Sequence, residues 1–229
     1  MIKVTSFYDF FSIDKKSLPS IKNQLKNQGQ LLNIRGLILI GTEGINSTLS
    51  GEESCLENYK TLLESLFKQS FSYKDSFCET WNFKQLSIKI KSEIIKIGKS
   101  YPHLQKENNH IDAEKWNHKI KNEAQILDVR NTYEVNLGKF KNAKDLQIEN
   151  FQEFPSKIAS APLDKKKETL IYCTGGIRCE KAIEIMKEKG FQKVYQLNGG
   201  ILEYLKQKSS RFFEGECFVF DHRVSIDKS

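Results

Sequence analysis

The chain has 229 residues, 38% of them hydrophobic and 28% charged, which is typical of a soluble folded protein with one large domain or two small ones. No run approaches the roughly 20 apolar residues of a membrane-spanning helix, and the N-terminus lacks the pattern of a secretory signal. We therefore expect a cytoplasmic protein that does not insert into membranes. The net charge of +7 permits a polyanionic partner without requiring one.

The five cysteines are an odd number and include no C-x-x-C pair, which argues against a disulfide framework and a zinc ribbon. The middle of the chain contains three histidines, His103, His110 and His118. Their spacing matches no compact ligand set, so we predict surface histidines and no metal site.

The first strand is predicted at residues 3–8, which are β-prone. Pro19 lies near the start of the next helix, whose apolar stripe includes Ile21 and Leu25, and Gly29 is expected to end it. The continuous apolar run 37–40 predicts a strand inside a sheet.

Residues 41–51 form a turn-rich segment in which we expect a second short strand, and residues 52–67 have the apolar spacing of a helix. Alternation returns over residues 81–97, which we expect to hold the last strand. This order predicts an α+β domain at residues 1–97 with a ferredoxin-like, that is acylphosphatase-like, β-α-β-β-α-β arrangement.

A polar linker with one short helical piece is predicted at residues 98–122, which include Pro102. After it, short apolar strands alternate with helices, which predicts an α/β domain with a parallel sheet and helices on both faces. We place this domain at residues 123–208 and a C-terminal tail at residues 209–229. Its expected strands are 125–130, 169–173 and 194–197, and its expected helices are 179–189 and the segment after 200.

The segment from Cys173 to Arg178 carries the clearest chemistry. Its cysteine ends a predicted strand, where open α/β sheets place their ligands. The glycine pair allows the backbone to curl, so that N–H groups form an anion cradle, and the following helix and Arg178 add positive charge. We therefore predict a depressed pKa for Cys173. The residues of the cradle are Thr174, Gly175, Gly176 and Ile177.

A buried strand cysteine beside a glycine turn is the simpler alternative, but it explains neither the glycine pair nor Arg178. The six-residue span is shorter than the loops that wrap a phosphate in cysteine phosphatases, and a smaller cradle suits sulfur carried on the cysteine or another compact group.

This region resembles the rhodanese family in three elements: Asp-Val-Arg at 128–130 with Glu134, the loop at 173–178, and Asn-Gly-Gly at 198–200. The resemblance implies a rhodanese-like fold for this domain. It departs from many rhodaneses at 138–140, where Gly-Lys-Phe replaces Gly-His-Ile. Asp128 and Arg130 are expected to support the loop, or equally to have a purely structural role through buried hydrogen bonds.

Two further segments narrow the resemblance, Thr-Glu-Gly-Ile-Asn-Ser-Thr-Leu-Ser-Gly at 42–51 and Gly-Glu-Cys-Phe-Val-Phe-Asp-His-Arg-Val at 215–224. With the cysteine loop they are similar to the signatures of the tRNA uridine-34 hydroxylase family. That resemblance implies oxygen-dependent formation of 5-hydroxyuridine at the wobble position, with Cys173 as the key residue and Cys179 as a second, supporting one. Molecular oxygen is then a co-substrate, and no flavin, haem or iron-binding signature is evident.

The thiolate could add to C6 of uracil and activate C5, or could be oxidised by oxygen to a reactive sulfur species. Cys179 could resolve an oxidised Cys173 as a disulfide, or pack beneath the loop. The alternative enzyme is a rhodanese-type sulfurtransferase that carries persulfide on Cys173. A catalytically idle module that binds RNA or protein is a third hypothesis.

Under the hydroxylase hypothesis the partner is tRNA and the first domain is its docking surface. Taken singly, each basic side chain there is more typical of a solvated surface residue. Tyr8 could stack on a base, whereas Phe7 is expected in the core. Glu43 and Asn46 could bind a ligand or cap the backbone. The predicted phosphate contacts are Arg35, Lys89, Lys91 and, secondarily, Lys84.

Overall fold

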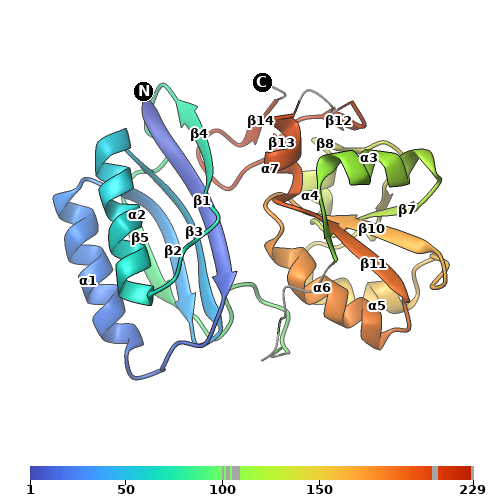
Figure 1. Cartoon of the computed structure of the whole chain (residues 1–229), viewed down its shortest axis with the longest axis horizontal. Coiled ribbons are helices and arrows are strands. Elements are labelled where there is room, and N and C mark those ends of the chain that lie inside the picture. The colour runs from blue at the N-terminus through green and yellow to red at the C-terminus, as the bar shows by residue number, and fades with distance from the viewer. Residues whose placement is uncertain (100, 102–103, 105–108, 208–210, 228–229) are drawn as a thin grey trace. The chain divides into compact units, whose positions relative to one another are not determined.

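The computed structural model describes residues 1–99, 101, 104, 109–207 and 211–227. The chain folds into two compact units, Met1–Ile95 and Lys96–Ser229, each with its own hydrophobic core (Figure 1). No helix in these described ranges is long and apolar enough to cross a membrane.

The first unit is a five-stranded sheet in the order β4-β1-β3-β2-β5, with both of its helices on one face (Figure 1). All neighbouring strands are antiparallel except β2 and β5. The order of the first four strands is that of a ferredoxin-like domain, so the predicted fold class is confirmed. The elements are β1 (Ile2–Phe10), α1 (Leu18–Leu31), β2 (Arg35–Gly41), β3 (Gly44–Gly51), α2 (Glu53–Phe67), β4 (Lys74–Cys78) and β5 (Leu86–Ile90).

Alternation along the strands decides which side chains enter the core of the first unit. Phe7 and Ile38 point to the helices and are 2% and 0% exposed. They pack with Leu25 of α1 and Tyr59 of α2, and the Tyr59 hydroxyl donates a hydrogen bond of 2.8 Å to the carbonyl of Leu25. The intervening residues of each strand lie on the opposite face of the sheet.

Three details of the first unit correct the sequence prediction. Helix α1 runs two residues past Gly29, where a Cβ atom would lie 2.3 Å from Leu86 Cδ2, so this glycine permits close helix–sheet packing instead of ending the helix. The segment expected to be turn-rich is mostly strand β3. The last ferredoxin-like strand is β4, and β5 is an extra edge strand parallel to β2. Strand β4 escaped prediction because, at the sheet edge, its sequence Lys-Asp-Ser-Phe-Cys has no apolar alternation.

The second unit is built on a parallel sheet in the order β6-β11-β10-β7-β9, with α3 and α7 on one face and α5 and α6 on the other (Figure 1). This confirms the predicted parallel sheet. Its elements are β6 (His110–Ile111), α3 (Ala113–Lys121), β7 (Gln125–Asp128), α4 (Thr132–Val135), β8 (Gly138–Phe140), β9 (Lys144–Asp145), a 3-10 turn (Phe151–Glu153), α5 (Phe154–Ala159), β10 (Glu168–Tyr172), α6 (Ile177–Glu188), β11 (Lys193–Leu197), α7 (Gly200–Leu205), β12 (Phe213–Gly215), β13 (Cys217–Phe218) and β14 (Ser225–Ile226).

Residues 110–121, expected to end the linker, belong to this second unit. Strand β6 pairs with β11, and Trp116 of α3 is fully buried with its ring 5.2 Å from that of Phe140. The expected tail also contributes, because Phe213 of β12 pairs with Phe140 and is 0% exposed. Both segments contain few apolar residues, and polar residues separate them, so the sequence pattern did not predict this packing.

The histidines of that segment have hydrogen-bonding partners in the second unit. His110 Nε2 lies 3.3 Å from a carboxylate oxygen of Glu180, and His118 Nδ1 lies 3.3 Å from the side-chain nitrogen of Asn122. His103 and Pro102 lie outside the described residues.

Candidate active site

Cys173 follows the last residue of β10 at the carboxyl end of the parallel sheet, and α6 begins four residues later. Gly176 has φ of +102°, a left-handed conformation that turns the chain into the helix. Its backbone N–H donates a hydrogen bond of 3.1 Å to Cys173 Sγ. The glycine curl therefore directs a backbone donor at the sulfur, as the sequence pattern suggested.

The surroundings of Cys173 favour its thiolate. Burial opposes ionisation, but a hydrogen bond from Cys179, the charge of Arg178, and backbone N–H groups of Arg178 and Gly176 outweigh it and lower the pKa of Cys173 to about 6. Burial and the neighbouring Cys173 raise the pKa of Cys179 well above its ordinary value. At neutral pH the pair is thus a thiolate and a thiol, with Cys179 as the donor.

Arg178 is held by a buried carboxylate. Its Nη1 and Nη2 atoms donate to the two oxygens of Glu134 at 2.5 and 2.7 Å, and the Thr174 hydroxyl donates to the same carboxylate at 3.1 Å. Burial would raise the pKa of Glu134, but the Arg178 charge outweighs it and the pKa is lowered. Arg178 therefore gives the loop a fixed positive charge while its side-chain donors face Glu134.

The role of Glu134 was missed at the sequence level, where it appeared only as part of the Asp-Val-Arg element. It lies at the third position of α4, in a capping box in which its carboxylate accepts from the backbone N–H of Asn131 at 3.2 Å. The Asn-x-x-Glu spacing was a usable signal for that helix start. The pairing with Arg178, 44 residues away, was not readable from spacing.

Asp128 and Arg130 form a second buried ion pair at the end of β7. Arg130 Nε and Nη2 donate to Asp128 at 2.9 and 2.7 Å, and Nη2 also donates to the carbonyl of Gly138 at 2.6 Å. Both side chains are 0% exposed. A Cβ atom at Gly138 would lie 2.6 Å from the carbonyl oxygen of Glu214, which explains the glycine beside β12.

The Asn-Gly-Gly element holds the cysteine loop from the N-terminus of α7. The N–H groups of Ile201 and Leu202 donate to the carbonyls of Cys173 and Thr174, each at 3.1 Å. Gly200 has φ of +66°, and a Cβ atom there would lie 2.5 Å from the Cys173 carbonyl oxygen. The three rhodanese-like elements thus meet around one loop.

Cys173 is 0% exposed, as is Cys179 beside it. The partly exposed loop residues are Gly175 and Ile177, and a Cβ atom at Gly175 would meet nothing within 4 Å. A third fully buried thiol, Cys217, lies on β13, where burial raises its pKa to about 12. Gly175 and Ile177 are thus the loop residues that meet solvent, whereas the Cys173 sulfur is covered.

The predicted tRNA contacts of the first unit lie on or near the sheet face opposite its helices. The Arg35 guanidinium carbon stacks 3.9 Å from the ring centroid of Trp81. Lys89 pairs with Leu39 in the β2–β5 register, which places it on the same face as Arg35. Tyr8 is half-buried on this face, with the Lys74 ammonium 5.1 Å from its ring. Lys84 and Lys91 are exposed beside β5.

Glu43 and Asn46 act as backbone caps. A Glu43 carboxylate oxygen accepts from the N–H of Ile94 at 2.7 Å, and the Asn46 amide donates to the carbonyl of the same residue at 3.1 Å. Of the two alternatives left by the sequence, the structure supports capping for both residues. Phe7 is in the core, as expected.

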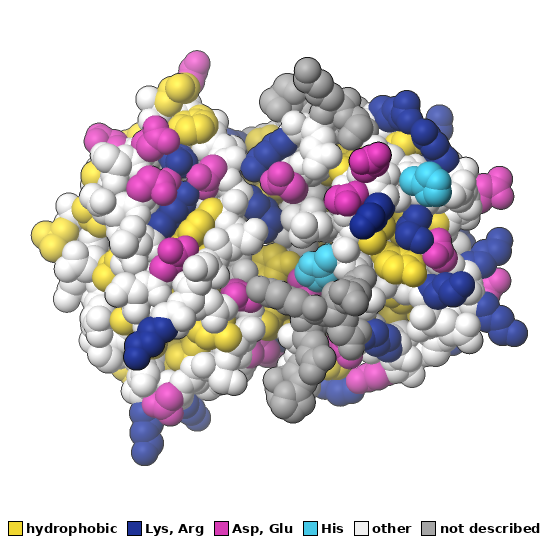
Figure 2. Space-filling view, in the orientation of Figure 1, with side chains coloured by type: hydrophobic (Ala, Val, Ile, Leu, Met, Phe, Trp, Pro, Cys, Tyr) yellow, Lys and Arg dark blue, Asp and Glu magenta, His cyan; other side chains and the backbone are white. Residues whose placement is uncertain are grey.

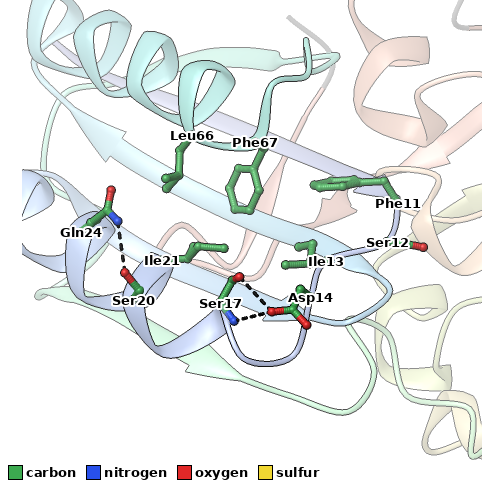
Figure 3. A pocket seen from close by; sticks show the side chains of 10 residues that line it. All are labelled: Phe11, Ser12, Ile13, Asp14, Ser17, Ser20, Ile21, Gln24, Leu66 and Phe67. Atoms are coloured by element: carbon green, nitrogen blue, oxygen red, sulfur yellow. Dashed lines mark hydrogen bonds between the residues drawn. The ribbon is translucent and has the colours of Figure 1, made fainter.

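A pocket of about 420 Å³ lies in the first unit between the start of α1 and the end of α2 (Figure 3). Asp14 accepts from the backbone N–H and hydroxyl of Ser17 beside it, at 3.1 and 3.0 Å. None of the predicted site residues lines this pocket.

Acidic and basic side chains are interspersed over the visible face of each unit (Figure 2), so the net positive charge is not concentrated in one patch on that face.

Comparisons with known proteins match both units. Residues 2–94 match the UPF0176 acylphosphatase-like domain, and residues 112–207 match the rhodanese-like domain. Relatives named tRNA uridine(34) hydroxylase include one from Pelagibacter ubique, 42% identical over 99% of this chain and 75% of its own length. Another, from Bdellovibrio bacteriovorus, is 39% identical over 99% of this chain and 65% of its own length. The chain therefore spans slightly less than two thirds of the Bdellovibrio relative.

Proposed function

Because the chain belongs to the tRNA uridine(34) hydroxylase family, we propose that it is an enzyme that converts uridine at position 34 of tRNA to 5-hydroxyuridine, with molecular oxygen as co-substrate. The cytoplasm, where tRNA is found, is its proposed location. The observation that carries this proposal is similarity over 99% of the chain, combined with a loop in which the backbone N–H of Gly176 donates to Cys173 Sγ.

In this proposal Cys173 is the catalytic residue. With a pKa of about 6 it is largely ionised at neutral pH, and the thiolate is the nucleophilic form of cysteine. Addition to C6 of uracil would raise the electron density at C5, the carbon that receives the hydroxyl group. Oxidation of the sulfur by oxygen is the second chemistry open to it. Arg178 and Cys179 stabilise the thiolate, and Asp128 with Arg130 supports the strand ends beneath the loop.

We propose tRNA as the macromolecular substrate, with phosphate contacts from Arg35, Lys89 and Lys91. Arg35 is stacked on Trp81, which orients its guanidinium, whereas the two lysines are exposed. Replacing each by alanine should weaken tRNA binding uniformly across sequences and reduce its salt dependence by about one ion per contact.

The experiment that tests the activity is mass spectrometry of tRNA nucleosides from a strain in which the gene is deleted. We expect 5-hydroxyuridine and its derivatives to disappear, and to return with the wild-type gene but not with Cys173→Ser. Unchanged levels of these nucleosides in the deletion strain would overturn the proposal.

The rhodanese-like match over residues 112–207 makes a sulfurtransferase the alternative. A thiosulfate:cyanide assay separates the two reactions, with Cys173→Ser as the control. Thiocyanate formation that depends on Cys173, together with unchanged tRNA nucleosides, would favour sulfur transfer.

A further inference from the structure

Large hydrophobic side chains are exposed at two neighbouring segments of the second unit. Among the residues described in that unit they are Tyr133 and Leu137, at 44% and 41% exposure, and Phe220 and Val224, at 57% and 54%. The first two lie on α4 and just after it. The other two lie in the β13–β14 hairpin, residues 217–226.

Three rings join these segments into what we call the aromatic patch, consisting of Tyr133, Phe218 and Phe220. The Tyr133 and Phe218 ring centroids are 5.2 Å apart at an interplanar angle of 78°, and those of Phe218 and Phe220 are 5.0 Å apart at 80°. The backbone N–H of Glu216 donates to the carbonyl of Leu137 at 2.9 Å and fixes the hairpin beside α4. The patch is therefore one continuous surface.

The hairpin that presents the two phenylalanines is internally braced. Val219 N–H donates to the carbonyl of Val224 at 2.8 Å, and Arg223 forms a bidentate pair with Asp221 at 2.9 and 2.5 Å. Strand pairing between Cys217 and Ile226 closes its base. The rings are thus held at the surface by a defined structure, and exposed apolar patches of this kind mark binding sites.

The aromatic patch borders the cysteine loop. The Arg178 guanidinium carbon lies 5.8 Å from the Phe220 ring centroid, and Tyr133 directly precedes Glu134, which holds Arg178. Cys173 is 0% exposed, so an RNA base can reach its sulfur only after leaving the stack of neighbouring bases and inserting into the cysteine loop. The bases on either side of it would then lie over the surface next to the loop.

We propose that the aromatic patch binds unpaired RNA bases next to the target uridine by stacking. This inference rests on the proposed function. Exposed aromatic rings stack on unpaired bases, whatever their sequence. The aromatic patch borders the loop that must receive the target base, and this position favours RNA over a second protein as its occupant.

The test measures binding of an anticodon stem-loop RNA by fluorescence anisotropy. We expect Phe220→Ala and Tyr133→Ala each to raise the dissociation constant about 5- to 150-fold, the range for loss of one stacked base. Phe220→Trp and Tyr133→Phe should stay within about twofold of the wild type. A blunt duplex with the sequence of the same stem should bind all variants alike, because it offers no unpaired bases. Phe77→Ala, which removes a ring 50% exposed in the first unit, is the matched control.

Thermal unfolding and the thiolate absorbance of Cys173 establish that the variants fold and keep the site intact. If the wild type hydroxylates tRNA and both alanine variants bind the stem-loop within twofold of it, the patch proposal is overturned and the enzymatic one stands. An altered oligomeric state with unchanged RNA binding would also overturn it, in favour of a protein contact. If the alanine variants lose stem-loop binding while the wild type leaves tRNA uridine unmodified, the patch stands and the hydroxylase proposal fails.

Discussion

The two units place their charged groups in different surroundings. In the first unit Lys3 and Lys60 share the carboxylates of Glu57 and Asp75 at 2.7–3.2 Å, and Glu57 is 49% exposed. In the second unit the Arg178–Glu134 and Arg130–Asp128 pairs have side chains at most 6% exposed. The first cluster joins α2 to the sheet, whereas the Arg178–Glu134 pair lies beside the thiol of Cys173.

The two surroundings differ in what can stabilise a charged side chain after its ion-pair partner has been removed. In the first cluster the Glu57 carboxylate is half-exposed, so water solvates its charge when a lysine partner is lost, and its ion pairs have a small net effect on stability. A charge left alone beside Cys173 has no water to replace its partner, and its desolvation penalty remains uncompensated. A site that must hold a thiolate can use such pairs because their geometry and field are fixed.

The largest expected effect is that of Glu134→Ala. It leaves the buried Arg178 guanidinium without its carboxylate partner, and the free energy of unfolding measured with urea should fall by about 3–5 kcal/mol. The double variant Glu134→Ala/Arg178→Met should recover much of that loss, because it removes the unpaired charge. A loss below about 1 kcal/mol in the single variant would show that water reaches this pair.

The next prediction concerns the pH dependence of Cys173. The difference in absorbance at 240 nm between the wild type and Cys173→Ser should titrate with a midpoint near pH 6. The folded pKa lies below the unfolded value of about 8.5, so the thiolate contributes fully to stability above about pH 8.5, and this contribution is lost as the pH falls through 6. The stability difference between the two proteins should shrink over that window. A midpoint near 8.5 would contradict an activated thiolate.

Cys179→Ala tests the neighbouring thiol as a donor. Removing its hydrogen bond should raise the pKa of Cys173 by about 1–2 units, because hydrogen bonds to charged groups contribute about 1.5–3 kcal/mol. The same absorbance titration measures the shift, and Cys55→Ala in the first unit is the control. An unchanged midpoint would mean that Cys179 only fills space beneath the loop.

The smallest effect is expected for Glu57→Gln in the first unit. Its carboxylate is half-exposed, so the free energy of unfolding should fall by less than about 1 kcal/mol, and the difference should largely vanish in 1 M salt, where charges are screened within about 3 Å. A loss as large as that of Glu134→Ala would remove the contrast between the two units.

The cysteine loop was predictable because its parts are contiguous. Cys173, the glycine pair and Arg178 lie within six residues, and the strand before them and the helix after them have clear periodicity. The role of Glu134 was not predictable from the sequence, because it depends on an ion pair with Arg178, 44 residues away. Strand β4 was missed for a related reason, since its Asp75 faces Lys60 of α2 and the strand therefore lacks an apolar alternation.

The sequence by itself determined the division into an α+β and an α/β region, the strand–loop–helix segment that holds Cys173, and the family, because all of these depend on local periodicity and on short contiguous motifs. Only the tertiary structure decided which acid holds Arg178, that Cys179 donates to Cys173, and that Tyr133, Phe218 and Phe220 form one surface beside the loop. Each of these depends on the geometry of side-chain contacts, which residue spacing in the sequence does not reveal. Several of the contacts also join residues that are distant in the chain.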